Sequence, residues 1–164
     1  MTSAQASLVL MAAEIPAGSK VLVIGAESFR TLTREAGYQV VDSAEDKPAA
    51  VVQGMDKALG WKELSEAAYA INNGAKFFAT NLDTSLPTER GFAVGNGALV
   101  GAVAASTGVE PISAGKPEPA MFTYAAKKVG SKKPLAVGDR LDTDIAGGNA
   151  AAMDTCLLYT SLMA

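Results

Sequence analysis

The sequence predicts an α/β fold in which helices cover a mostly parallel sheet. Short, continuously apolar runs alternate along the chain with longer segments whose apolar residues recur at helical spacing. Strands separated by helices are typical of parallel sheets joined by right-handed crossovers. The 164 residues are 49% hydrophobic and 19% charged, an ordinary composition for one globular domain or two small ones.

The first half of the chain contains three helices and four strands in this interpretation. Pro16 ends an alanine-rich helix, Gly37 ends the second helix, and Gly74 ends an amphipathic third one. An acidic turn over residues 42–48 separates two of the strands. The predicted helices cover residues 3–14, 29–36 and 61–73. The predicted strands cover residues 20–25, 38–41, 49–54 and 76–80.

The second half continues the alternation with shorter elements. A Gly/Pro loop over residues 113–119 separates two alternating blocks, so we expect a boundary near residues 108–115. The last helix should begin near Thr143 or Asp144, where a hydroxyl or carboxylate can accept backbone N–H bonds. The predicted helices cover residues 97–106, 118–129 and 144–152, and one further strand covers residues 134–137.

Composition excludes several classes of function. The formal net charge of −3 provides no sequence-wide basic field, so we expect neither nucleic acid nor a membrane as the main partner. The single cysteine, Cys156, rules out an internal disulfide framework. Because histidine is absent, catalysis depends on carboxylates, lysine or hydroxyls. No apolar run reaches the roughly 18 residues that cross a bilayer, and we expect a cytoplasmic protein.

Three acids follow the strand predicted over residues 134–137. Ligands of open parallel sheets bind outside the carboxyl ends of strands, which favours a functional role for Asp139 over a solvated loop acid. Magnesium takes one or two protein carboxylates together with substrate phosphate and water, so Asp139 indicates a magnesium and phosphate site. Asp142 is interpreted as surface charge, and Asp144 as a helix start.

Other polar residues are weaker candidates on spacing alone. Lys116 lies in a proline-stiffened loop and could neutralise a phosphoryl group, although a solubilising lysine is the simpler interpretation. Asn81 and Asp83 follow a strand and either form an Asx turn or contact a ligand. The GNGAL stretch at residues 95–99 could form an anion-binding nest but lacks a phosphate-loop lysine. The methionines on predicted helices are expected in the core: Met11, Met121 and Met153.

The segments GKPEPAMF and VGDRLDTDI, preceded by GAKFFATNLD and PTERGFAVGNGALV, resemble one branch of the haloacid dehalogenase (HAD) superfamily. That branch contains phosphoglycolate, nitrophenyl and nucleotide phosphatases, and the resemblance spans residues 2–155. It implies that Lys116 stabilises the phosphoryl group and the nucleophile. It also implies that Asp139 ligates Mg²⁺, that Asp144 supports the metal site, and that Asn81 and Asp83 help a cap select the substrate.

The resemblance also implies how the chain is divided. A partial Rossmann-like HAD core would carry an inserted α/β cap, with the remaining residues as a linker and a tail. The expected ranges are 1–20 for the end of an N-terminal core segment, 21–113 for the cap, 114–155 for the C-terminal part of the core and 156–164 for the tail.

The chain departs from this family in two blocks. Such phosphatases use an aspartate nucleophile and a second aspartate in a DxDG block, followed by a Ser/Thr-Asn block, and neither block is present. The only DxD is at residues 142–144. Without a nucleophile there is no phosphoaspartate step, so we expect the chain alone to be inactive. Its core sheet would also lack a central strand and leave apolar edges that favour association.

Both ends of the sequence suggest a fragment of a longer gene. Residues 1–6 resemble an internal VTSAQA stretch of the family, as if a GTG valine codon had been read as a start. Residues 156–161 back-translate as TGT CTC TTA TAC ACA TCT, which matches a transposon end used in sequencing libraries. We therefore hypothesise that residues from about 156 onward are adapter-derived; an ordinary strand LLYTSL is the alternative.

The sequence thus predicts that the parent protein is a magnesium-dependent phosphatase of a small phosphorylated metabolite, acting through an aspartyl-phosphate. A non-catalytic phosphate- or nucleotide-binding module is the alternative from a different class. A dinucleotide-dependent oxidoreductase is disfavoured because no GxGxxG is present. Neither the substrate nor the oligomeric state follows from the sequence, and a homo-oligomer is left open.

Overall fold

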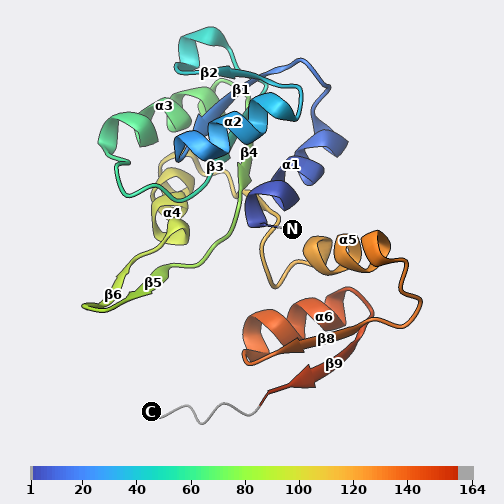
Figure 1. Cartoon of the computed structure of the whole chain (residues 1–164). Coiled ribbons are helices and arrows are strands. Elements are labelled where there is room, and N and C mark those ends of the chain that lie inside the picture. Colours follow the sequence, from blue (N-terminus) through green and yellow to red (C-terminus); the bar gives the residue numbers. More distant parts are fainter. Residues whose placement is uncertain (1, 159–164) are drawn as a thin grey trace.

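Five parallel strands form the larger of two parallel sheets in this computed structural model, which describes residues 2–158 (Figure 1). The strand order is β2-β1-β3-β4-β7, and every neighbouring pair is parallel. The bounds are Lys20–Ile24 for β1, Gln39–Val41 for β2, Ala50–Gln53 for β3, Lys76–Ala79 for β4 and Ile112–Ser113 for β7. The central strands are buried on both faces, which explains their continuous apolar runs.

Helices cover both faces of the larger sheet. Helices α1 (Ser3–Glu14) and α2 (Glu27–Glu35) pack on one face, in a core that includes Met11, Phe29 and Phe78. Helices α3 (Trp61–Asn72) and α4 (Asn96–Thr107) pack on the other face. Successive residues of a strand point to opposite faces, so the adjacent Phe77 and Phe78 belong to different cores. Helix α1, which the sequence assigned to a separate segment, therefore shares a core with this sheet.

An antiparallel hairpin, absent from the sequence prediction, projects from the larger sheet between β4 and α4 (Figure 1). Its strands are β5 (Ser85–Thr88) and β6 (Gly91–Val94). None of their residues is buried, so neither strand alternates between an apolar inner face and a polar outer face. Pro87 within β5 also argues against a strand in sequence reasoning, because proline cannot donate to the hydrogen-bond ladder.

The last third of the chain forms a smaller layer below the larger sheet in Figure 1. Strands β8 (Leu135–Gly138) and β9 (Asp154–Leu157) pair in parallel, and helices α5 (Ala120–Val129) and α6 (Ala146–Ala150) flank them. Helix α6 lies close to the pair, since a Cβ on Gly148 would come within 2.7 Å of the Ala136 Cβ.

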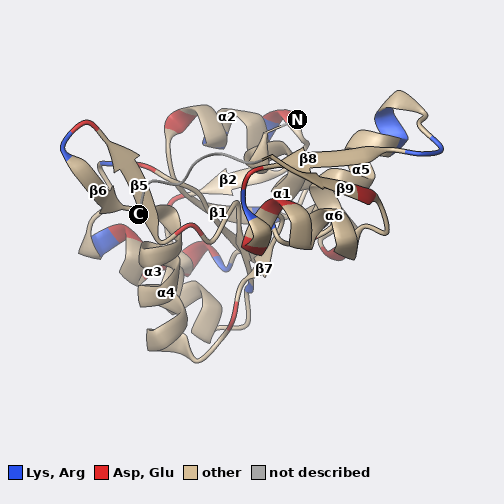
Figure 2. Cartoon of the chain, turned by 90° about the horizontal axis from the view of Figure 1, so that it is seen from below, with Lys and Arg blue, Asp and Glu red and all other residues tan. Residues whose placement is uncertain are grey.

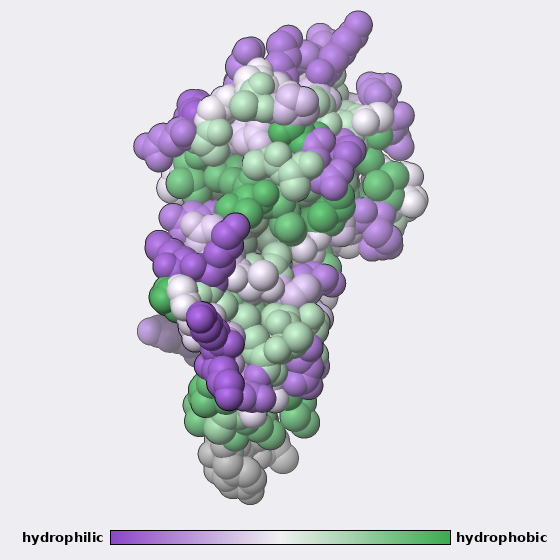
Figure 3. Space-filling view, turned by 90° about the vertical axis from the view of Figure 1, so that its right-hand side faces the viewer, coloured by the Kyte–Doolittle hydropathy of each residue, from purple (hydrophilic) through white to green (hydrophobic). Residues whose placement is uncertain are grey.

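Within residues 2–158, the opposite face of the β8–β9 pair is not covered. Leu135 and Val137 are 59% and 53% exposed there. Figure 3 shows apolar residues gathered at this end of the molecule. Exposed apolar strand residues favour association with another apolar surface.

Two local predictions near the C-terminal end are wrong. The last helix does not begin at Thr143 or Asp144: a π-helical turn over Leu141–Ile145 precedes α6, and the helix ends at Ala150. The reason is that Asp144 does not cap a helix but binds the loop before the turn, as described below. Cys156 lies in strand β9, whereas residues 159–162 of the alternative strand LLYTSL lie outside the described residues. The adapter origin of residues 156–164 stays a prediction.

The surface agrees with the low net charge. Figure 2 shows acidic and basic residues interspersed along the loops and helix surfaces. Among residues 2–158, no helix has both the length and the apolarity to cross a membrane.

Two phenylalanines test the buried sheet. We expect Phe78→Ala to lower the free energy of unfolding by about 3 to 5 kcal/mol, because the side chain is fully buried in the α1–α2 core. Phe92→Ala, on the hairpin and 83% exposed, should change it by less than about 0.5 kcal/mol. Urea unfolding of both variants measures the difference, and equal effects would contradict this packing.

Candidate functional site

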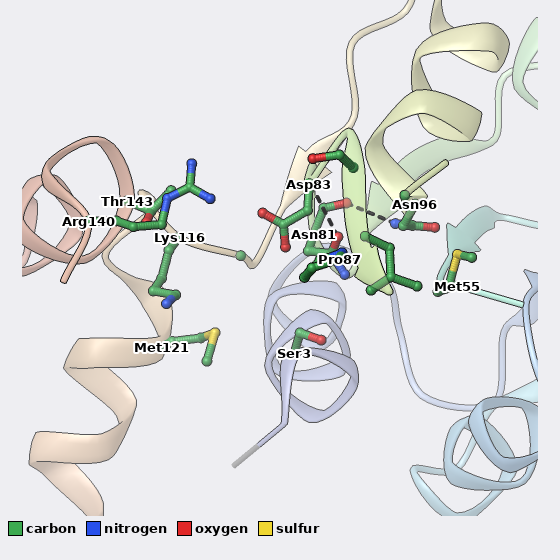
Figure 4. A pocket seen from close by; sticks show the side chains of 14 residues that line it. Ser3, Met55, Asn81, Asp83, Pro87, Asn96, Lys116, Met121, Arg140 and Thr143 are labelled. Carbon is green, nitrogen blue, oxygen red and sulfur yellow. Dashed lines mark hydrogen bonds between the residues drawn. The ribbon is translucent and has the colours of Figure 1, made fainter. Parts of the chain in front are cut away.

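A cavity of about 500 Å³ lies between the larger sheet and the smaller layer (Figure 4). Met55 follows β3, Asn81 and Asp83 follow β4, Lys116 follows β7 and Arg140 follows β8; all five line the cavity. Each comes just after the carboxyl end of a parallel strand, which is where ligands of open α/β sheets bind. The cavity therefore lies at the carboxyl ends of the strands, and Asp139 is not among the residues that line it.

The sequence left open whether Asn81 and Asp83 form an Asx turn or contact a ligand. The loop after β4 forms the turn and also places both side chains at the cavity. Asn81 Oδ1 accepts the backbone N–H of Asp83 at 3.2 Å, which is an Asx turn. Both side chains also line the cavity. Asn96, on α4, donates its Nδ2 to the Asn81 carbonyl at 2.8 Å (Figure 4). The amide group of Asn96 therefore holds this wall of the cavity in place.

The amino end of α4 is packed against the same loop, so residues 95–99 do not form the anion-binding nest that the sequence analysis considered and disfavoured. The backbone N–H groups of Gly95 and Gly97 donate to the carbonyls of Thr84 and Asp83 at 3.0 and 2.8 Å. A Cβ on Gly97 would overlap the Leu82 carbonyl. These glycines allow helix and loop to approach each other, and their N–H groups are already used.

Asp144 organises the opposite wall. Its Oδ1 pairs with the Lys116 ammonium, and its Oδ2 accepts the N–H groups of Asp139 and Arg140 at 3.2 and 3.3 Å. Burial alone would raise the pKa of the Asp144 carboxyl, but Lys116 and these N–H groups together lower it below its ordinary value. Gly138 has no room for a Cβ because the Asp144 side chain occupies that space. Asp144 thus fixes both Lys116 and the loop that carries Asp139.

Asp139 and Asp142 differ in what they contact. Asp142 pairs on the surface with Arg140 at 2.8 Å, and the bond to this carboxylate raises the pKa of Arg140. Asp142 is therefore a surface charge, as predicted. Asp139 is exposed, and within residues 2–158 its carboxylate forms no hydrogen bond or ion pair.

The fit of magnesium to these residues is partial. A carboxylate such as Asp139, at the carboxyl end of a strand, is the donor type that Mg²⁺ prefers. No group of three or more acidic, histidine or cysteine side chains within the described part of the chain could hold a metal ion. Asp139 can thus provide one magnesium ligand.

Sequence reasoning misplaced or missed several residues of the cavity. Met121 was expected in the core, but it is half-buried and lines the cavity, because α5 has no fully buried residue. Arg140 lines the cavity, but the sequence analysis assigned it no function. Its position next to Asp139 could have indicated one. No sequence pattern predicted the side chains of Asn96 and Met55 at the cavity, because their positions depend on how α4 and the loop after β3 pack.

Comparison with known proteins identifies the family. The profile of HAD-hydrolase-like proteins matches residues 113–162. The D-glycerol 3-phosphate phosphatase of Mycobacterium tuberculosis is 44% identical over 99% of this chain and 46% of its own length. The structure of a double mutant of the thermostable NPPase from Geobacillus stearothermophilus has a TM-score of 0.89 at 34% identity, covering 99% of this chain and 67% of that one. The chain belongs to the HAD-like hydrolase family.

The predicted family and α/β HAD fold are thereby confirmed. The glycerol phosphate phosphatase of M. tuberculosis was solved in complex with magnesium, with a TM-score of 0.91 at 45% identity over 95% of this chain and 47% of that one. An acid sugar phosphatase of Staphylococcus epidermidis is 37% identical over 99% of this chain and 62% of its own length. The HAD chain described here thus spans between about half and two thirds of these relatives.

Two glycines of α4 test the close approach between this helix and the loop. Gly97→Ala should lower the free energy of unfolding by about 2 kcal/mol, because the new Cβ overlaps the Leu82 carbonyl. Gly101→Ala, in the same helix with open space around it, should be neutral or stabilising by up to about 1 kcal/mol. Urea unfolding compares them, and a tolerated Gly97→Ala would contradict the contact.

Lys116→Met tests the ion pair with Asp144. The pKa of Asp144 should rise, because burial is then opposed only by backbone N–H groups. A lowered folded-state pKa stabilises the protein above the unfolded value of about 3.9, and this contribution is lost as the pH falls through the folded pKa. Lys116→Met should therefore reduce stability at neutral pH. Carboxyl NMR titration measures the pKa, with exposed Lys127→Met as the control; an unchanged pKa would show that the pair does not form.

Proposed function

We propose that these residues form the phosphate-binding wall and the substrate-selecting cap of a magnesium-dependent phosphatase. The substrate would be a small phosphorylated metabolite, hydrolysed through an aspartyl-phosphate. The observation that carries this proposal is the placement of Lys116 at the cavity by the Asp144 carboxylate. Relatives named D-glycerol 3-phosphate phosphatase, acid sugar phosphatase and 5'-nucleotidase support a phosphomonoester as the substrate class.

Lys116 would stabilise the negative charge of the phosphoryl group. Asp144 holds the ammonium while leaving the lysine side chain 43% exposed, so a ligand oxygen can reach it. A cation held in position before the ligand arrives requires little reorganisation, which is why such groups lower reaction barriers. Arg140, on the same wall, would contribute a second positive charge.

Asp139 would ligate Mg²⁺, with the remaining ligands supplied by phosphate, water and groups outside residues 2–158. When bound, the ion would supply charge that polarises a phosphoryl oxygen. Asp144 would act indirectly, because its bond to the Asp139 N–H orients the loop that carries the ligand. Asn81 and Asp83, on the opposite wall, would contact the organic part of the substrate.

The nucleophile is not among these side chains. The 164 residues contain no DxDG block, and their one DxD, at residues 142–144, is used for the Arg140 and Lys116 pairs. We therefore propose that residues 1–164 alone are inactive. The same observation favours a second candidate, a non-catalytic phosphate- or nucleotide-binding module.

We also propose a division into residues 1–20, 21–113, 114–155 and 156–164, a cytoplasmic location and a homo-oligomeric state. The apolar residues on the face of the β8–β9 pair that residues 2–158 leave uncovered support association with further polypeptide.

An assay on the complete product of the gene that encodes these residues tests the proposal. It should hydrolyse p-nitrophenyl phosphate in the presence of Mg²⁺. Lys116→Ala should lower kcat/KM about 100-fold or more, because a charge that stabilises the transition state is lost. Lys127→Ala, on the exposed side of α5, should leave it unchanged.

Two further outcomes separate the candidates. Residues 1–164 alone should show no magnesium-dependent hydrolysis; a rate that Lys116→Ala abolishes would refute their proposed inactivity. A complete gene product without a DxDG block that binds inorganic phosphate but does not hydrolyse the ester would favour the binding module.

A further inference from the structure

Two buried polar side chains near the carboxyl edge of the larger sheet carry atoms that have no hydrogen-bond partner within residues 2–158. Gln53, the last residue of β3, is fully buried, and Asn96, the first residue of α4, is 3% exposed. Within residues 2–158, the Nε2 and Oε1 atoms of Gln53 and the Oδ1 atom of Asn96 are unpaired. Buried polar atoms are nearly always paired, because leaving one unpaired is unfavourable. These atoms therefore indicate a partner that residues 2–158 do not supply.

Both side chains lie on the same face of the larger sheet. Gln53 comes two residues after Val51 in β3, so it points to the α3–α4 face, where Val51 packs with Val100. Asn96 is one helical turn before Val100 in α4. Gln53 is also the register partner of Ala79, and the Nδ2 of Asn96 binds the carbonyl of Asn81, two residues further along. The two amides are therefore near neighbours at the carboxyl edge of the sheet.

The chemistry of the unpaired atoms is defined. A backbone carbonyl only accepts, so the bond to Asn81 assigns the nitrogen of the Asn96 amide and leaves its oxygen as an acceptor. Figure 4 shows this oxygen turned away from Asn81, toward Met55. Gln53 adds one donor and one acceptor. A hydroxyl group can donate its proton to one of these two oxygens and accept a hydrogen bond from the Gln53 nitrogen, and a second hydroxyl can donate to the other oxygen.

Of the two amides, that of Asn96 lines the cavity, and Gln53 is linked to it through the chain at Met55. Asn96 and Met55 both line it, and Met55 comes two residues after Gln53. An unbranched methionine side chain can change rotamer readily, so a ligand can displace it and reach the amides. Lys116 and Arg140 line the other wall. The cavity thus has a cationic wall suited to phosphate and, across from it, amides suited to a hydroxyl group.

We propose that Gln53 and Asn96 form a hydroxyl-binding subsite that selects phosphomonoesters with a hydroxyl group on their organic part. This inference rests on the proposed phosphate site at Lys116. A substrate hydroxyl and a buried water share the required chemistry, and the experiment distinguishes them.

Glycerol 3-phosphate and n-propyl phosphate are the probes, because they share a carbon skeleton and differ in two hydroxyl groups. NMR titration of residues 1–164 follows the backbone amide of Lys116 and the side-chain amides of Gln53 and Asn96. Both ligands should shift the Lys116 signal, but only glycerol 3-phosphate should shift the two side-chain amides. We expect it to bind about tenfold more tightly than n-propyl phosphate, the effect of one good hydrogen bond.

Gln53→Met supplies a second measurement. Methionine retains the length of glutamine and removes its polar atoms, so the fold should be no less stable. The tenfold preference for glycerol 3-phosphate should fall to about one, with affinity for n-propyl phosphate unchanged. Gln39→Met, the same substitution at an exposed position of β2, should retain the preference.

Each failure has a distinct signature. If neither ligand shifts the Lys116 amide, the phosphate site and the subsite that depends on it are both wrong. If both ligands shift Lys116 equally and leave the side-chain amides unmoved, a buried water serves the amides and only the subsite is wrong. A Gln53→Met variant that keeps the tenfold preference would likewise overturn the subsite.

Discussion

The arrangement of the cavity depends on the parallel direction of the strands. In parallel sheets every carboxyl end lies at the same edge, so the loops after β3, β4 and β7 emerge together. The loop after β8, from the smaller sheet, reaches the same cavity. Side chains that are far apart in sequence thus face one space without any long excursion of the chain. Burial of the larger sheet on both faces makes this edge rigid, because the core strands have little freedom to shift.

Two polar side chains near the cavity form hydrogen bonds that hold backbone segments in place. Asp144 uses one carboxylate oxygen for Lys116 and the other for the N–H groups before the π-helical turn. Asn96 likewise uses its amide nitrogen for the loop after β4. In both cases a short-range bond sets where a neighbouring functional group lies. Within residues 2–158, the exposed Asp139 carboxylate forms no such bond. A carboxylate of this kind is a donor that Mg²⁺ prefers.

The two walls differ in their electrostatic character. Lys116 and Arg140 provide positive charge on one side, whereas Asn81, Asp83 and Asn96 provide oxygen acceptors on the other. A phosphate ester has the same polarity, with an anionic group at one end and hydroxyl donors at the other. This complementarity agrees with the kinds of relatives found, which are named for glycerol phosphate, sugar and nucleotide substrates. Discrimination among such ligands depends on the few atoms that contact the organic part.

The sequence by itself determined the order of most helices and strands, because Pro16, Gly37 and Gly74 end helices by local chemistry. It also determined the family, through motifs that retain their spacing. It could not predict the β5–β6 hairpin, whose strands have no buried face. The sequence already distinguished Asp139 from Asp144, but only the tertiary structure showed that Asp144 pairs with Lys116, 28 residues earlier in the chain. The burial of Asn96 could likewise not be predicted from the sequence, because it arises only when α4 packs on the sheet.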